Sequence, residues 1–68
     1  MTNTELLREK LDNSGYKLTF IAQSLDLSYQ GFLNKINNKT DFTAPEIAVL
    51  RKLLHLSSEE CNAIFFTL

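Results

Sequence analysis

The sequence predicts an all-α fold, a compact bundle of five short helices in a single domain that spans residues 1–68. Apolar residues recur at spacings of three and four along most of the chain, as on the buried face of a helix. The capping-box pattern, Ser or Thr followed three residues later by Glu, occurs at Thr2, Thr43 and Ser57. The chain is 44% hydrophobic with two glycines and one proline, which favours a folded helical domain over disorder.

The first helix is expected from about residue 3 to residue 13. The capping box of Thr2 and Glu5 marks its start. Its buried stripe, with a spacing of four, consists of Leu7 and Leu11. Tyr16 follows a polar turn, and we expect its ring to pack beside this helix with the hydroxyl at the surface.

The second helix begins near Lys17. Either this residue or Thr19 stands at the cap, so the boundary is open by about two residues. Its apolar stripe consists of Leu18, Ile21, Ala22 and Leu25. Phe20 lies off that stripe, and two roles are open for it: packing on the first helix, which we prefer, or contact with a subunit or partner.

The joint between the second and third helices is very short, because only residues 26–27 separate them. So tight a joint forces the helices to cross steeply, and the small side chain of Ala22 suits the place where the backbones approach. Asp26 tolerates the left-handed backbone that the turn needs. Ser28 is a good N-cap for the next helix. The pattern predicts a helix-turn-helix.

A family resemblance follows from these residues. The positions that carry it are Ala22, Asp26, Leu27, Phe32 and Ile36, then Asn38-Lys39 and the run Asp41-Phe42-Thr43-Ala44-Pro45-Glu46-Ile47. Their spacing resembles that of the lambda-repressor-like (Cro and repressor, or XRE-type) helix-turn-helix proteins of bacteria and their phages, over nearly the whole chain. The nearest resemblance is to small, single-domain phage-type regulators. It implies a lambda-repressor-like DNA-binding domain whose helix-turn-helix is formed by the second and third helices.

The outer face of the third helix is the candidate surface for reading bases. With Phe32 and Ile36 inward, helical geometry turns the intervening positions outward. The candidates for base contacts are Tyr29, Gln30, Leu33 and Asn34. An amide such as that of Gln30 or Asn34 can bind the N6 and N7 edge of adenine bidentately, whereas Leu33 suits a thymine methyl group. By resemblance, Tyr29, Gln30 and Asn34 coincide with base-contacting positions, although the Tyr29 hydroxyl could instead meet a phosphate.

A second group of polar residues suits the phosphate backbone of DNA. Its members are Lys17, Thr19, Ser28, Lys35, Asn37, Asn38, Lys39 and Thr40. The formal net charge of the chain is −1, which is unusual for a DNA-binding domain. Residues 17–40 nevertheless carry three lysines and one aspartate, so the positive charge is concentrated where DNA is expected.

The last two helices complete the expected bundle. Phe42 should anchor the preceding loop in the core. The fourth helix starts at the Thr43 capping box, with Pro45 in its first turn, and runs to about Leu54. The Ser57 box opens a final helix, whose apolar residues are Cys61, Ile64, Phe65 and Phe66, with Leu68 beyond. Two roles are open for this apolar tail. Part of it joins two subunits, or both phenylalanine rings enter the core of one subunit.

Together these patterns predict a sequence-specific DNA-binding transcriptional regulator, Cro-like or repressor-like, of a phage or prophage. We expect a cytoplasmic homodimer on double-stranded operator DNA, because a domain this small reads only a few base pairs. No cofactor, metal site, small-molecule substrate or membrane contact is expected, and the single histidine and single cysteine offer no catalytic grouping. The alternative is a protein-binding module of the same fold, such as a phage antirepressor that docks on a repressor and does not itself bind DNA.

Overall fold

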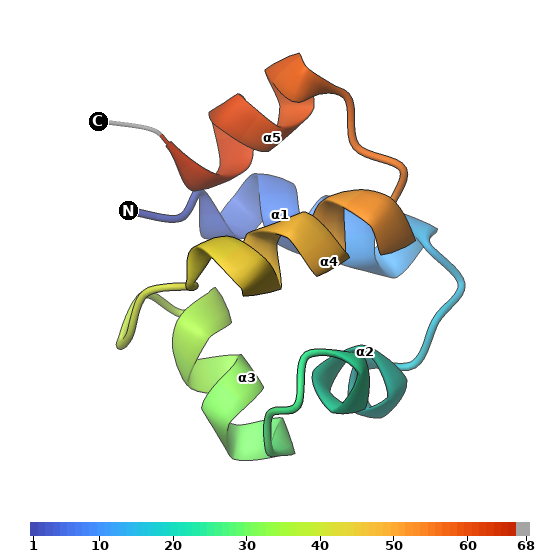
Figure 1. Cartoon of the computed structure of the whole chain (residues 1–68), viewed down its shortest axis with the longest axis vertical. Helices are drawn as coiled ribbons and strands as arrows, with labels where there is room; N and C mark the ends of the chain where they lie inside the picture. Colours follow the sequence, from blue (N-terminus) through green and yellow to red (C-terminus); the bar gives the residue numbers. More distant parts are fainter. Residues whose placement is uncertain (67–68) are drawn as a thin grey trace.

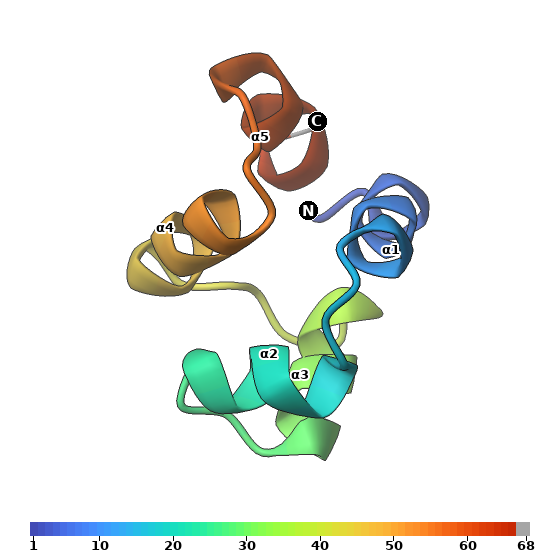
Figure 2. The same cartoon turned by 90° about the vertical axis from the view of Figure 1, so that its right-hand side faces the viewer.

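The computed structural model describes residues 1–66, and this part of the chain contains five α-helices (Figure 1). They are α1 (Thr4–Asn13), α2 (Leu18–Ser24), α3 (Tyr29–Ile36), α4 (Ala44–Leu53) and α5 (Ser58–Phe65). The pair α2–α3 forms one end of the molecule and α5 the other, with α1 and α4 between them (Figures 1 and 2). No strand occurs in the described residues, so the predicted all-α class with five helices is confirmed.

A single apolar core joins all five helices. Its most deeply buried side chains are Leu7, Ile21, Phe32, Ile36, Leu50 and Ile64. Three aromatic rings run through it edge to face, because Phe42 lies 6.3 Å from Phe32 and 5.5 Å from Phe65 between ring centroids. The loop between α3 and α4 is therefore anchored by Phe42, as predicted, and edge-to-face rings add to the area that each buries.

Two of the three predicted capping boxes are confirmed. The hydroxyls of Thr43 and Ser57 each accept from the backbone N–H of the glutamate three residues later, whose carboxylate accepts from the cap's own N–H. The box predicted at Thr2 is wrong. Asn3 is the N-cap of α1, since its side chain accepts from the Leu6 N–H at 3.1 Å. Asn is among the strongest N-cap residues, and it stands one position closer to the helix.

Thr2 is buried and serves the tertiary fold instead. Its N–H donates to Asn38 Oδ1 and its carbonyl accepts from Asn38 Nδ2, both at 2.8 Å. The next residue, Asn3, donates its N–H to the Ile64 carbonyl at 2.6 Å. The N-terminal segment therefore ties the turn after α3 to the last helix, as its place between α1 and α5 in Figure 2 indicates.

The start of α2 and the aromatic residues beside it bear on two expectations. Lys17 occupies the N-cap position without a side-chain cap, so the shorter helix capped by Thr19 is wrong. Tyr16 and Phe20 are 42% and 46% exposed, and they stack on each other with ring centroids 5.2 Å apart. Neither ring is among the apolar side chains packed against the core, although Tyr16 borders a hollow that Lys10 and Asn13 of α1 also line. The expected packing of the two rings on the first helix therefore stays a prediction.

The C-terminal aromatic residues divide between core and surface. Phe65 is buried with Cys61 and Ile64, whereas Phe66 is 61% exposed. The alternative in which both rings enter the core is therefore wrong. α4 ends at Leu53, within the expected margin, and Leu68 lies outside the described residues.

Candidate nucleic-acid interface

The turn between α2 and α3 is held by its own backbone. Leu25 and Ser28 are the caps on its two sides, and Asp26 takes the left-handed conformation expected of it, with φ 60°. The Leu27 N–H donates to the Ala22 carbonyl at 2.9 Å. Ala22 is buried, as a close approach of the two helix backbones at this position requires. The turn thereby fixes the direction in which α3 leaves α2.

The first turn of α3 is closed by its cap. Ser28 Oγ accepts from the Gly31 N–H at 3.0 Å, which confirms the N-cap role of this serine. A Cβ atom at Gly31 would also lie only 3.0 Å from that oxygen. The small size of Gly31 is therefore explained locally, because any larger residue would press on the Ser28 hydroxyl that caps the helix.

Two amides lie together on the outer side of α3. Gln30 Nε2 donates to Asn34 Oδ1 at 3.0 Å, a hydrogen bond across one helical turn. Gln30 is exposed and Asn34 half-buried. Among residues 1–66 the bond engages only one of the two Nε2 hydrogens, so Gln30 keeps its second hydrogen and its Oε1 acceptor for another partner.

The other two base-contact candidates differ in exposure. Tyr29, at the first position of α3, is 46% exposed. Leu33 is half-buried and packs against the core. Its side chain therefore stabilises the fold as well, and a thymine methyl group could meet only the part that stays accessible.

Two of the expected backbone contacts are engaged inside the molecule. Lys35 Nζ donates to Glu46 Oε1 at 2.6 Å, and the two side chains are only 14% and 13% exposed. Burial raises the pKa of Glu46, but hydrogen bonds from Lys35 and from the Thr43 N–H outweigh burial and hold that pKa below its ordinary value. Lys35 thus joins α3 to α4. Because its ammonium group is held by Glu46 inside the fold, the expected contact of Lys35 with a DNA phosphate is withdrawn.

Asn38 is the second correction. It takes a left-handed backbone with φ 64°, and its side chain binds Thr2 as described above and donates to Thr4 Oγ1 at 3.1 Å. The Thr4 hydroxyl in turn donates to the Ile36 carbonyl at 2.6 Å, the last residue of α3. Because every polar atom of the Asn38 amide has a partner within the fold, it is not free to bind a phosphate.

The remaining backbone candidates are exposed. They are Lys17, Thr19, Ser28, Asn37, Lys39 and Thr40. Neither Lys17 nor Lys39 forms an ion pair with the described residues, so both ammonium groups are available. With Lys35 neutralised by Glu46, these two lysines are the cations that the helix pair and its flank contribute to this surface.

Arg8 is a residue that the sequence interpretation missed. Its Nη2 donates to Asn37 Oδ1 at 3.0 Å, which places a guanidinium of α1 beside the C-terminal end of α3. The two residues are 29 positions apart, and no local pattern connects them. The pair adds one cation to the candidate surface.

Comparison of the chain with protein-family models, with curated proteins and with solved structures found no match. Among the helices of residues 1–66, none combines the length and the apolar character that a membrane span requires. In the same part of the chain, no three His, Cys, Asp or Glu side chains gather as metal ligands would.

Proposed function

We propose that this protein is a sequence-specific DNA-binding transcriptional regulator in which α2 and α3 form a helix-turn-helix of the lambda-repressor-like kind. The observation that carries the proposal is the hydrogen-bonded pair of Gln30 and Asn34 on the outer side of α3, at the end of the molecule remote from α5. Lys17 and Lys39, which form no ion pair with residues 1–66, flank the α2–α3 pair along the chain. α3 would enter the major groove, where these amides meet base edges.

The geometry of the amide pair suggests how a base is read. Gln30 can accept from adenine N6 through Oε1 and donate its second Nε2 hydrogen to adenine N7. Asn34 holds the plane of that amide by accepting the first hydrogen. The Asn34 Nδ2 group is a donor and suits an acceptor on a neighbouring base, such as thymine O4 or guanine O6. The lysines and Arg8 supply phosphate contacts without choosing sequence.

A homodimer fits this role, since one copy reads only a few base pairs. Two copies on half-sites about one helical turn apart would supply useful specificity. The complex would act by occupying an operator and blocking transcription, with the amount of protein or another regulator protein as the control.

Selection from a pool of random duplexes, followed by titration of the enriched sequence at two salt concentrations, tests the proposal. Gln30→Ala and Asn34→Ala should each weaken binding by about 1–3 kcal/mol while the melting temperature stays constant. Asn34→Asp keeps an acceptor for Gln30, so the preference for adenine at the Gln30 base should survive in this variant and be lost in Asn34→Ala. Enrichment of no sequence, or equal binding by all four proteins, would contradict the proposal.

The exposed stack of Tyr16 on Phe20 favours a second candidate, a protein-binding module of the same fold that docks on another regulator and leaves DNA alone. Titration at low salt separates the two, because even non-specific DNA binding should then be measurable for a DNA-binding domain. Absence of any binding under those conditions, together with capture of a transcriptional regulator encoded beside the gene for this chain in a pull-down, would favour the docking module.

A further inference from the structure

A groove on the side of the molecule formed by the α1–α2 loop, the end of α2 and the end of α4 has no role in the proposed DNA contact. It is lined by Tyr16, Ser24, Val49, Lys52, Leu53 and His55, and we name it the Tyr16 groove. Its volume is about 310 Å³, the lower end of the range for binding clefts. No residue of α3 lines it, so it stays open while α3 is occupied.

The groove is apolar where a small monomer would ordinarily be polar. Tyr16 is 42% exposed, Val49 is 36% exposed, and Phe20 extends the same surface by stacking on Tyr16. Exposed apolar side chains gathered in one place, rather than scattered singly, mark surfaces that associate with other molecules. Aromatic residues are also enriched among the residues that dominate binding energies.

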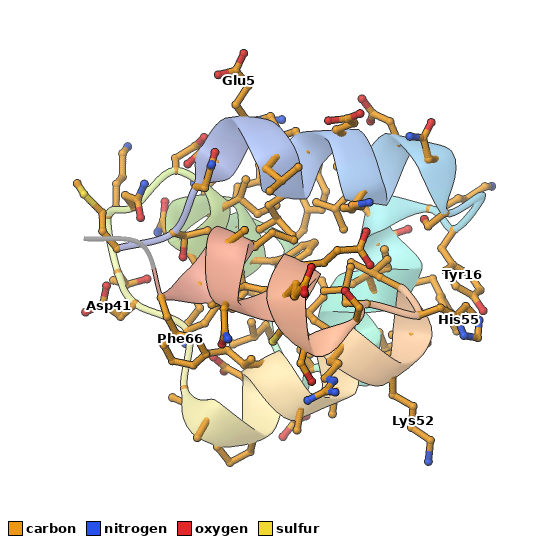
Figure 3. All side chains as sticks on the ribbon, turned by 90° about the horizontal axis from the view of Figure 1, so that it is seen from above. Glu5, Tyr16, Asp41, Lys52, His55 and Phe66 are labelled. Carbon is orange, nitrogen blue, oxygen red and sulfur yellow. The ribbon has the colours of Figure 1, made fainter. Side chains whose placement is uncertain are left out.

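Both ends of the groove are held by ordered turns. On one side the Tyr16 N–H donates to Ser14 Oγ at 3.1 Å, while that hydroxyl donates to the Leu11 carbonyl at 2.7 Å. On the other side His55 has φ 54°, and the Leu56 N–H after it donates to the Arg51 carbonyl at 2.9 Å. Figure 3 shows Tyr16 and His55 beside each other at one edge of the molecule. A groove fixed in this way costs little ordering when a partner binds.

The charge of the rim selects the partner. Lys52 forms no ion pair with residues 1–66, and no carboxylate lines the groove. Glu60, a carboxylate in the adjoining hollow that Tyr16, Leu53 and His55 also line, is paired with Lys10. Asp41 and Phe66, an acidic and an exposed aromatic residue, lie at the opposite edge in Figure 3. The groove is thus basic at its rim and apolar in its floor.

We propose that the Tyr16 groove binds an acidic amphipathic segment of another protein, with an apolar anchor side chain in the groove and carboxylates beside Lys52. Complementary charge at the rim would steer such a segment, and the apolar floor would hold it. Because α3 takes no part, the protein could hold this segment with or without DNA.

The test uses helical peptides of about 15 residues that carry Leu, Phe or Trp at i and i+4 with Glu elsewhere, and the same peptides with Lys in place of Glu. Titration of the full chain followed by two-dimensional amide NMR should shift resonances of the groove residues with the Glu peptides only. Lys52→Glu should weaken that binding by about fivefold or more, whereas its matched control, Lys39→Glu, should not. Val49→Ser should weaken it as well, and Phe66→Ser, another exposed apolar residue, should leave it unchanged.

Several outcomes would overturn the proposal: no Glu peptide binds, the Lys peptides bind equally well, or the shifts fall outside the groove. Shifts of groove residues with duplex DNA would assign the groove to nucleic acid. Concentration-dependent self-association that Val49→Ser abolishes would assign it to a second copy of this chain. Melting temperatures of the variants exclude unfolding as the cause. Failure of the DNA proposal would be distinguishable, because the protein would then bind the Glu peptides but no DNA duplex.

Discussion

Glycine substitutions at two left-handed positions should change stability in opposite directions. Asp26 and Asn38 have nearly the same backbone, with φ 60° and φ 64°. Each non-glycine residue costs energy there, and glycine would relieve about 0.5–1 kcal/mol of it. The side chains differ. The carboxylate of Asp26 is exposed and makes no hydrogen bond within residues 1–66, whereas the side-chain amide of Asn38 makes three.

The magnitude follows from those three bonds. Asn38 Oδ1 accepts from the Thr2 N–H, and Nδ2 donates to the Thr2 carbonyl and to Thr4 Oγ1. At about 1 kcal/mol net for each bond, and with Thr2 in a buried place, Asn38→Gly should lose roughly 3 kcal/mol of interactions. Subtracting the backbone relief leaves a net loss of about 2 kcal/mol. Asp26→Gly should instead gain about 0.5–1 kcal/mol.

Urea denaturation followed by circular dichroism measures both changes. For a domain of this size, 1 kcal/mol corresponds to about 4–8 °C, so thermal melting should show the opposite signs clearly. Asn38→Ala should be less stable than Asn38→Gly, since it loses the same bonds and keeps a side chain at positive φ. An Asn38→Gly protein as stable as the wild type would show that the bonds to the N-terminal segment contribute nothing net, and would refute the reasoning.

Three further predictions concern charge and packing. Lys39→Ala should weaken the binding of all DNA duplexes alike and lower the slope of log affinity against log salt by about one unit. Lys35→Ala breaks a largely buried ion pair with Glu46 and should instead lower the melting temperature. A lower melting temperature for Lys39→Ala and a lower salt slope for Lys35→Ala would contradict the structure. The Lys10 ammonium donates a hydrogen bond to Glu60 and helps lower the pKa of that carboxyl from 4.5 to about 2. The stability that this carboxylate adds should therefore be complete above pH 4.5 and be lost as pH falls towards 2. In Glu60→Gln this pH-dependent loss of stability should be absent. Ala22→Leu should lower stability by about 1–3 kcal/mol through overpacking, and an unchanged melting temperature would mean that α2 and α3 do not meet there.

Features whose partners are close in the sequence were predictable. The capping boxes at Thr43 and Ser57 need only two residues three positions apart, and the left-handed Asp26 follows from the joint that contains it. The error at Thr2 is also local. Two adjacent residues could cap the first helix, and the pattern alone does not reveal that the Thr2 backbone is used by Asn38.

Features of the candidate surface depend on distant partners, and here the sequence interpretation fell short. Lys35 and Glu46 are 11 residues apart, Arg8 and Asn37 are 29 apart, and Asn38 and Thr2 are 36 apart. A polar residue near a helix end has the same local pattern whether it faces solvent or a partner from another helix. Only the packing of α1 and α4 around α3 decides between the two.

The same contacts bear on how α3 would work in the proposed complex. Its first turn is closed by Ser28, its last carbonyl is bound by Thr4, and the amide of Gln30 is oriented by Asn34. Little of the base-reading surface would therefore need ordering on DNA, whereas each unpaired lysine would lose about 0.5–1.5 kcal/mol of side-chain freedom. An ordered reading surface with few free lysines favours specificity over total affinity. The ordered amides discriminate between bases, whereas few protein cations are available to neutralise phosphates and release their counterions. A chain with net charge −1 can then be a selective DNA-binding protein only as a weak one that relies on pairing two copies.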